Sequence, residues 1–492
     1  MAWNPEFNVA FNPKTIAVVG ASTTPSWIGG TSFITHLQDF GYPGRIYPIN
    51  PKADGMEIRG LKAYPNLTSV PEPIDLVIIS VPAPVIHTVL EDCIAANAKN
   101  IYIFTAGFDE TGEEEGLKLG ARLKEIAVRG QLRIIGPNCM GLYVPAAKMS
   151  IWEGTPVESG KVGLISQSGG HAGQFVSNAS VQGIGISKAI SFGNGTIMEA
   201  TDFLEYFAND AETEIIAMYL EGTRDGQKLL KLIREINKTK PIIIWKGGLT
   251  ESGARAVASH TGSLGGEREI WNTFFHQTGA VGVDSLEELV DVTMTFLHLS
   301  PRPQGRRVAL LGAGGGNSVA GADTLNREGL VVPKLSDATR KKLRDFIPSA
   351  GTSIANPLDI GLVLRDISLL ERALDPISAD PNIDAMVFGL PIGLLSRVPD
   401  TKQTDDELQT VYETETKNRL EVISKFNKES ANRKPVVVVP RGWRPERVIL
   451  EEARRAQTEF AKAGIPAYAS LQQAGKAMAK FMQYQESKKN GA

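Results

Sequence analysis

Short apolar runs that end in glycine, proline, serine or asparagine recur along the first third of the chain, with amphipathic stretches between several of them. They occupy residues 15–22, 45–52, 75–84, 100–108 and 133–141. Alternation of short buried strands with helical patterns predicts a parallel, doubly wound sheet. Each single turn is also explained as an ordinary strand-to-helix connection. Five such turns on one edge favour a nucleotide-like ligand, because the carboxyl ends of parallel strands form the usual binding edge.

The same pattern continues to the end of the chain, as expected for about three domains in 492 residues. Further buried strands are predicted at 161–166, 187–191, 214–220, 241–246, 307–311, 385–390 and 435–440. Proline- and glycine-containing stretches at 145–160 and 299–305 read as linkers. We therefore expect an α/β protein with three consecutive doubly wound domains, at residues 1–150, 155–300 and 305–485.

A histidine set among small polar residues is the most distinctive chemical feature of the sequence. It lies in the segment Ala258-Ser259-His260-Thr261-Gly262-Ser263, which we expect to form a loop after the strand at 241–246. Small neighbours let another group approach closely, and an imidazole can act as a base, a metal ligand or a nucleophile. No second metal ligand stands at a suitable spacing, so no metal site is expected. An ordinary surface histidine remains the alternative at this point.

Two other features of the middle domain could act together with His260. The turn Ser166-Gln167-Ser168-Gly169-Gly170 opens a helix, whose free N–H groups can hold an anion. Glu221 follows a predicted strand, where its carboxylate could support an imidazole, although an exposed strand-end acid would look the same. His171 is a second histidine at the helix start, and we rank it below His260.

Glycine-rich turns in the outer domains are weaker signals. The turn after the first strand lacks the G-x-G-x-x-G pattern, so a standard nicotinamide site is not expected. Another phosphate-type turn follows the strand at 307–311 and contains Gly314, Gly315, Gly316 and Asn317.

Composition narrows the function classes. The formal net charge is −3, with 42% hydrophobic and 22% charged residues, which does not favour a nucleic-acid or membrane surface as partner. The two cysteines, Cys93 and Cys139, lie far apart, which suits a reducing compartment. Neither a signal peptide nor a membrane-spanning run is recognised, so a cytoplasmic location is expected.

Several motifs of the first domain together resemble the CoA-binding domain of the NDP-forming acyl-CoA synthetases, the superfamily of succinyl-CoA synthetase. They are Val19-Gly20-Ala21-Ser22, Ile49-Asn50-Pro51-Lys52, Val81-Pro82-Ala83-Pro84 and Ile135-Gly136-Pro137-Asn138-Cys139. The resemblance implies a Rossmann-like domain whose turns hold coenzyme A, with Lys52 available to its phosphates. For Cys139, a small buried residue is an equally good reading.

The middle and last domains resemble the two flavodoxin-like ligase domains of the same superfamily. The motifs are Ile165-Ser166-Gln167-Ser168-Gly169, Met218-Tyr219-Leu220-Glu221-Gly222, Trp245-Lys246-Gly247-Gly248 and Ser259-His260-Thr261-Gly262-Ser263. By this resemblance His260 is phosphorylated, Glu221 supports it, and the helices after Gly170 and after Gly316 face the phosphohistidine. The Ser-His-Thr-Gly-Ser form is similar to the ADP-forming acetate–CoA ligases.

The resemblance implies an α subunit that converts acyl-CoA, phosphate and ADP to an acid, CoA and ATP through an acyl phosphate and a phosphohistidine. No ATP-grasp module is recognised in the sequence. ADP or ATP with Mg²⁺ is therefore expected on an ATP-grasp β subunit, in an α2β2 assembly. Two alternatives remain, an acyl or carbamoyl transferase that has lost ATP-grasp and a CoA-binding sensor without catalysis.

Overall fold

A computed structural model describes residues 5–24, 28–261, 268–394, 404–431 and 433–490 of the chain. These residues form two compact units. One contains residues 1–180 and 185–289, and the other contains residues 181–184 and 290–492.

The first sheet of the larger unit is parallel and has the strand order β2-β1-β5-β6-β7. Its strands are β1 (Thr15–Val19), β2 (Arg45–Ile49), β5 (Leu76–Ile79), β6 (Asn100–Ile103) and β7 (Arg133–Ile135). Its helices are α1 (Gly30–Asp39), α2 (Ile86–Ala95) and α3 (Glu114–Gly130), and the hairpin strands β3 (Glu57–Ile58) and β4 (Leu61–Lys62) lie beside it.

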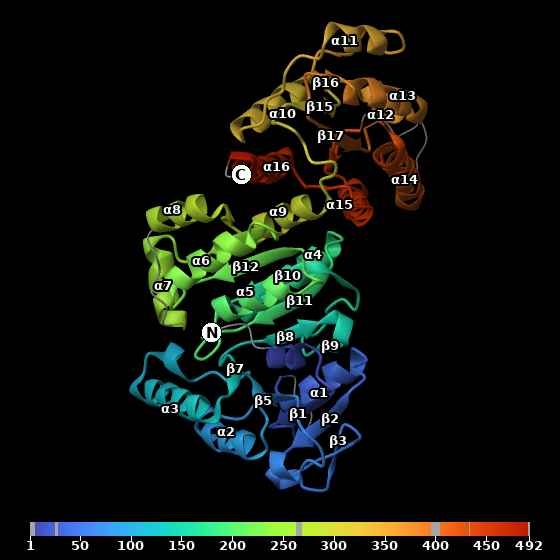
Figure 1. Cartoon of the computed structure of the whole chain (residues 1–492). Coiled ribbons are helices and arrows are strands. Elements are labelled where there is room, and N and C mark those ends of the chain that lie inside the picture. The colour runs from blue at the N-terminus through green and yellow to red at the C-terminus, as the bar shows by residue number, and fades with distance from the viewer. Residues whose placement is uncertain (1–4, 25–27, 262–267, 395–403, 432, 491–492) are drawn as a thin grey trace. The chain divides into compact units, whose positions relative to one another are not determined.

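Alternate residues of these strands point to opposite faces, so each strand can bury apolar side chains on both sides. Val77 and Ile101 pack with Leu90 of α2 and Leu123 of α3 in one core. Figure 1 shows α2 and α3 together on one face of this sheet. The strand order reverses between β1 and β5, which places the switch point of the sheet at the turn after β1.

The second sheet of this unit has the strand order β14-β13-β12-β10-β11-β8-β9. Its strands are β8 (Gly141–Val144), β9 (Met149–Ser150), β10 (Ser159–Ser166), β11 (Ile186–Ser191), β12 (Ile215–Leu220), β13 (Ile242–Lys246) and β14 (Val281–Val283). Its helices are α4 (Gly169–Val181), α5 (Ala200–Asn209), α6 (Gly226–Ile236), α7 (Glu251–Thr261) and α8 (Arg268–Thr278). The helix α9 (Leu286–His298) begins in this unit and continues in the smaller one.

The five strands β10 to β14 run parallel, whereas β8 pairs antiparallel with β11 and with β9. Residues 141–150, which are expected within the first domain, form the antiparallel edge of the second sheet. The expected doubly wound, parallel architecture is thus found with a short antiparallel addition, of a kind that α/β sheets often carry.

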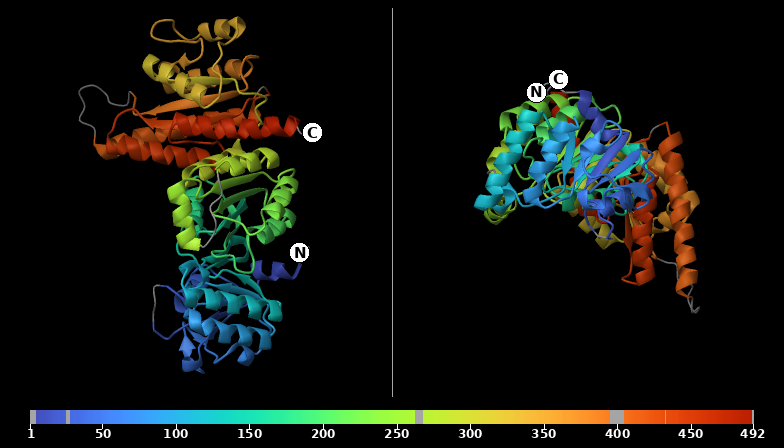
Figure 2. Two further views of the ribbon diagram at one scale, coloured as in Figure 1. Left: turned by 90° about the vertical axis from the view of Figure 1, so that its left-hand side faces the viewer. Right: turned by 90° about the horizontal axis from the view of Figure 1, so that it is seen from below.

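The smaller unit contains a parallel sheet of order β16-β15-β17-β18. Its strands are β15 (Val308–Gly312), β16 (Leu358–Asp359), β17 (Ala385–Ile392) and β18 (Val436–Gly442). Its helices are α10 (Gly315–Arg327), α11 (Asp337–Arg344), α12 (Gly361–Arg365), α13 (Ile367–Ser378), α14 (Asp405–Glu429), α15 (Arg447–Lys462) and α16 (Leu471–Asn490). Figure 2 shows α14 and α15 side by side, and the two helices share a small apolar core.

The structure confirms the α/β class and the strand positions predicted from the apolar runs. Among the described residues no helix is both long and apolar enough to span a lipid bilayer. The same part of the chain contains no cluster of three or more His, Cys, Asp or Glu side chains that could hold a metal ion.

Candidate functional site

A cavity of about 970 Å³ opens where β12 and β13 end. The turn before α4 and the helices α7 and α8 complete its walls. The polar and aromatic side chains that line it are Ser168, His171, Tyr219, Glu221, Trp245, Lys246, Thr250, Arg268 and Asp284. The structure therefore brings two of the predicted residues, Ser168 and Glu221, to the carboxyl edge of one sheet.

Glu221 is buried, with 5% of its surface exposed, so the alternative of an exposed strand-end acid is wrong. Tyr219 donates a hydrogen bond from its hydroxyl to Oε1 of Glu221 over 3.0 Å. Oε2 is buried and has no hydrogen-bond partner among the described residues. The backbone N–H groups of Glu221 and Gly222 both donate to Oε1 of Gln167, at 2.8 and 3.1 Å, which fixes the end of β12. A buried carboxylate oxygen without a partner is costly unless another group uses it.

Lys246 is a buried cation beside this carboxylate, with 4% of its surface exposed. Its ammonium donates to the carbonyl oxygen of Glu221 at 2.9 Å and to that of Gly247. Burial lowers the pKa of Lys246 to about 8, although the charge of Glu221 acts in the opposite direction. The lysine therefore ties the ends of β12 and β13 together and places a titratable cation at the cavity wall.

The turn that opens α4 is held by its serines. Ser166 is fully buried, and its hydroxyl donates to the carbonyl oxygen of Ser168 over 2.6 Å. It shapes the turn, whereas Ser168 lines the cavity. The helix begins at Gly169, where a Cβ atom would lie 2.6 Å from Cγ of Met140. The first turn thus needs glycine for packing, and Gly170 follows it in the helix whose N-terminus favours an anion.

His260 is the penultimate residue of α7, so the prediction that it lies in a loop is wrong for its backbone. The helix begins at Glu251, and the alanines at 254, 256 and 258 favour its continuation up to the glycine at 262. The side chains of residues 258–261 and the whole of residues 262–267 lie outside the described residues. Ala256 and Val257, which precede His260 by one turn, line the cavity.

The predicted CoA turns meet at the carboxyl edge of the first sheet. Gly20 has φ +96°, and a Cβ atom there would lie 2.3 Å from the carbonyl oxygen of Ser80, so this close approach of two turns requires glycine. Asn50 donates from its side chain to the carbonyl oxygen of Ala21 at 2.7 Å and accepts from the backbone N–H of Lys52 at 2.9 Å. This asparagine joins the turns after β1 and β2 and leaves the Lys52 side chain exposed.

The other predicted CoA residues at this edge have backbone roles in the structure. The N–H of Ser22 donates to Oγ1 of Thr31 at 2.8 Å, which ties the first turn to α1. The carbonyl oxygen of Val81 accepts from the hydroxyl of Thr105 at 2.7 Å, and Pro82 leads into the turn before α2.

The turn after β7 shows how Asn138 and Cys139 differ. Asn138 has φ +57° and donates from its side-chain amide to Oδ1 of Asn194 at 3.3 Å. Asn194 in turn donates to Glu110, so this asparagine pair connects the edges of the two sheets. The Cys139 side chain is buried, its thiol donates to the carbonyl oxygen of Ile103, and burial raises its pKa. The structure favours the packing interpretation of Cys139.

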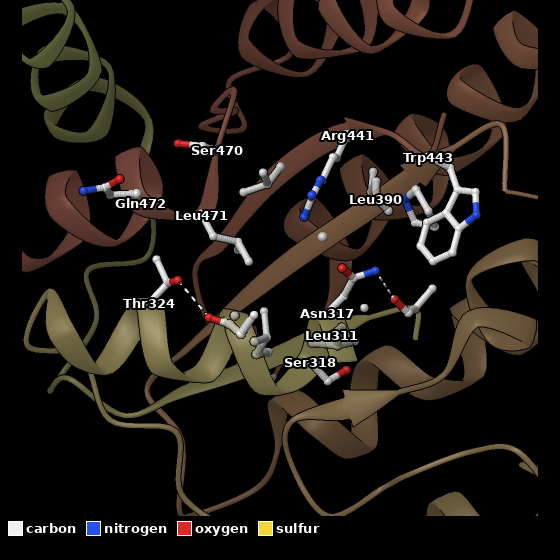
Figure 3. A pocket seen from close by; sticks show the side chains of 18 of the residues that line it. Leu311, Asn317, Ser318, Thr324, Leu390, Arg441, Trp443, Ser470, Leu471 and Gln472 are labelled. Atoms are coloured by element: carbon white, nitrogen blue, oxygen red, sulfur yellow. Dashed lines mark hydrogen bonds between the residues drawn. The ribbon is translucent and has the colours of Figure 1, made fainter. Parts of the chain in front are cut away.

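The glycine-rich turn of the smaller unit lies at a second cavity, of about 420 Å³ (Figure 3). Gly314 has φ +87°, and its N–H donates to Oδ1 of Asp359 at 2.7 Å. Gly315 and Gly316 begin α10, and Asn317 points to the cavity from its first turn. Figure 3 shows Arg441 and Trp443 on the opposite wall. A guanidinium above a helix N-terminus is an arrangement that suits an anion.

Sequence reasoning missed several residues of both cavities. Lys246 had a recognisable signal, because a lysine that ends a fully apolar strand must find buried partners. Tyr219 alternates with Glu221 on the same face near the end of β12, which is the period-2 signal for their contact. Arg441 and Trp443 come directly after the strand predicted at 435–440, so the rule that ligands bind at the carboxyl ends of strands would have included them.

Family models match two parts of the chain. Residues 14–145 match the model described as a CoA binding domain, and residues 159–296 match the model described as a succinyl-CoA ligase like flavodoxin domain.

Similar proteins cover nearly the whole chain. The α subunit of acetate–CoA ligase (ADP-forming) I from Pyrococcus furiosus is 34% identical over 97% of both chains. The acetyl-coenzyme A synthetase 1 from Candidatus Korarchaeum cryptofilum, solved with phosphate and ADP, is 32% identical, with a TM-score of 0.81 over 98% of this chain and 97% of that one. Some relatives are longer, and the chain spans 54% of the acetate–CoA ligase (ADP-forming) I from Archaeoglobus fulgidus.

Proposed function

This chain belongs to the ADP-forming acetate–CoA ligases as an α-subunit-like acyl-CoA synthetase, and on that premise we propose that His260 and Glu221 carry its phosphoryl transfer. The observation that supports this proposal is the buried Glu221 carboxylate, whose Oε2 has no partner among the described residues and which lines the cavity beside α7. A carboxylate in such a place can accept a hydrogen bond from an imidazole and stabilise its positive charge.

The proposed reaction has three covalent steps. An oxygen of inorganic phosphate attacks the thioester carbonyl, the carbon–sulfur bond breaks, and CoA leaves as the thiolate. An imidazole nitrogen of His260 then attacks phosphorus, the bond between phosphorus and the acyl oxygen breaks, and the carboxylate leaves. A terminal phosphate oxygen of ADP finally attacks this phosphorus, the bond between phosphorus and the imidazole nitrogen breaks, and ATP and free His260 result. Glu221 holds the imidazole, while the α4 N-terminus with Ser168, Gly169 and Gly170 stabilises the phosphoryl oxygens.

The turns at Gly20, Asn50 and Asn138 are proposed to hold CoA. Asn50 joins the turns after β1 and β2, and a Cβ at Gly20 would lie 2.3 Å from the carbonyl oxygen of Ser80 in the turn after β5. These neighbouring turns can present main-chain N–H groups to a pyrophosphate. Lys52 is exposed next to Asn50 and can pair with a CoA phosphate. In the smaller unit, Gly314, Gly315, Gly316 and Asn317 are proposed to bind phosphoryl oxygens at the start of α10.

The related α subunits act with a partner subunit, and the same is inferred for this chain. We propose that the partner is an ATP-grasp β subunit that supplies the ADP and Mg²⁺ site, in an α2β2 assembly. The test is to mix the chain with a candidate ATP-grasp subunit, ADP, phosphate and a panel of acyl-CoA esters. We expect ATP and free CoA in equal amounts, and only with both chains. Release of CoA without ATP would favour a transferase, and CoA binding without turnover would favour a sensor.

A further inference from the structure

His171 is a chemically active side chain of the cavity that the proposed reaction does not use. This residue is the third of α4 and lines the same cavity as Glu221. Its ring centroid lies 4.6 Å from those of both Tyr219 and Trp245, which are also 4.6 Å from each other. Three mutual ring contacts hold the imidazole in one position.

The packing of His171 does not satisfy its polar atoms. Nδ1 is buried and has no hydrogen-bond partner among the described residues. Its backbone N–H donates to Oγ of Ser168 at 3.3 Å, so the described contacts of the ring itself are aromatic. A phenyl ring would make the same contacts without burying an unpaired nitrogen, which is unfavourable. An imidazole at this position therefore needs a partner that the described residues do not provide.

The surroundings of His171 indicate an anionic partner. The ring stands in the first turn of α4, where the helix N-terminus attracts negative charge. Ser168 adds a hydroxyl, and Arg268 lines the same cavity from the start of α8. The carboxylate of Glu221 is turned to the Tyr219 hydroxyl, and the Tyr219 ring also packs on His171.

We propose that His171 is a further substrate-binding residue, whose imidazole forms a hydrogen bond to the inorganic phosphate that attacks the thioester. This inference rests on the proposed function, since it takes phosphate as the occupant of the cavity. His171 forms no covalent bond in this role. It holds one phosphate oxygen at the α4 N-terminus, so that another oxygen is free to attack the carbonyl carbon.

The test is the dissociation constant of inorganic phosphate, measured by calorimetry on the full chain and its variants. His171→Phe keeps an aromatic ring against Tyr219 and Trp245 but removes the hydrogen bond. We expect it to weaken phosphate binding at least about tenfold, the loss of one charge-assisted hydrogen bond, with acyl-CoA affinity within twofold of the original. His171→Gln should recover part of the loss. His276→Phe, at an exposed histidine near the end of α8, is the matched control.

Phosphate affinity of His171→Phe equal to that of the unchanged chain would overturn the inference and leave His171 as a packing residue. Labelling of the protein from radioactive phosphate and acyl-CoA shows separately whether the proposed function holds. Label retained in His171→Phe at saturating phosphate, and lost in His260→Ala, supports both ideas. Label lost in His171→Phe and retained in His260→Ala would make His171 the phosphoryl acceptor and contradict both. Weakened phosphate binding in a chain that never takes label would support the inference alone.

Discussion

The hydroxyl of Tyr219 donates to Oε1 of Glu221 over 3.0 Å, and the two residues stand at adjacent same-face positions at the end of β12. Tyr219 is 7% and Glu221 5% exposed, so this bond forms out of contact with bulk water. It fixes one oxygen of the carboxylate and leaves Oε2 for a group in the cavity. The arrangement gives a carboxylate that is oriented before substrate binds, as an electrostatic role in catalysis requires.

Replacing Glu221 by Gln removes its charge and keeps its shape. We expect the rate of protein phosphorylation from acyl-CoA and phosphate to fall on the order of 100-fold, because the imidazolium of His260 loses its stabilising charge. Tyr219→Phe leaves the charge but frees the carboxylate to rotate, so its loss should be smaller. Rapid-quench measurement of label incorporation compares the two. A Glu221→Gln rate equal to that of the unchanged chain would contradict the role given to Glu221.

Lys246 should make the stability of the larger unit depend on pH in the alkaline range. Its pKa is about 8 in the folded chain and 10.5 when unfolded, so between these values the unfolded chain binds more protons. Below pH 8 the folded chain carries the full free-energy cost of burying the Lys246 cation. This cost falls as the pH rises from about 8 to 10.5, because the buried amine loses its proton first. Relative to Lys246→Met, the unchanged chain should therefore gain stability over that interval.

Urea midpoints at pH 7.5, 9 and 10 measure this difference. Lys240→Met is a matched control for activity. Like Lys246, Lys240 donates to two backbone carbonyl oxygens, those of Phe207 and Asp210, but it does not line the cavity. We expect Lys246→Met to lower label incorporation and Lys240→Met to leave it unchanged. A constant stability difference from pH 7.5 to 10 would contradict the lowered pKa of Lys246.

Gly20→Ala should abolish CoA binding and destabilise the fold. The new Cβ would lie 2.3 Å from the carbonyl oxygen of Ser80 at φ +96°, so backbone must move in the turns proposed to hold CoA. We expect a cost of more than about 2 kcal/mol. Gly55→Ala measures the cost of the positive φ angle without a steric clash, because Gly55 has φ +71° and open space around its Cβ position. We expect this variant to lose about 1 kcal/mol of stability. Thermal unfolding and CoA titration test both variants, and equal costs would contradict the tight turn.

Both cysteines should resist alkylation while the chain is folded. Cys93 and Cys139 are buried, and burial raises the pKa of each thiol, which suppresses the reactive thiolate. Titration with a thiol reagent should find less than one reactive group in the native chain and two in urea. Rapid native modification of Cys139, blocked by CoA, would instead support a direct contact between its thiol and the ligand.

The sequence predicted the architecture well because apolar runs mark strands and glycine marks the tight turns after them. It placed β2 at Arg45–Ile49 and β7 at Arg133–Ile135 with the bounds found in the structure. It could not predict that residues 141–150 join the second sheet, because pairing across distant strands leaves no local pattern. The helix α14 begins in a strongly charged stretch, yet it buries Leu408, Tyr412 and Thr416 at helical spacing.

The site was predicted in part for similar reasons. Glu221 and Ser168 each follow a strand, and the carboxyl ends of parallel strands lie at one edge of a sheet. Their proximity could therefore be predicted. Whether Glu221 is buried depends on Gln167 and Tyr219 around it, which is a tertiary property. His171 was ranked low because its neighbours indicate a helix start. The helix is present, but its first turn faces the cavity, where a histidine has chemical use.

The central claim is that His260 accepts a phosphoryl group from acyl phosphate, and the most direct measurement is the chemistry and position of that group. The chain is incubated with acyl-CoA esters and radioactive phosphate, with and without the ATP-grasp subunit, beside His260→Ala. The account predicts an acid-labile, base-stable label on the peptide that contains His260, passed to ADP when the partner is present and lost in His260→Ala. Label of that kind persisting in His260→Ala, or no label with any ester and partner while CoA still binds, would contradict it.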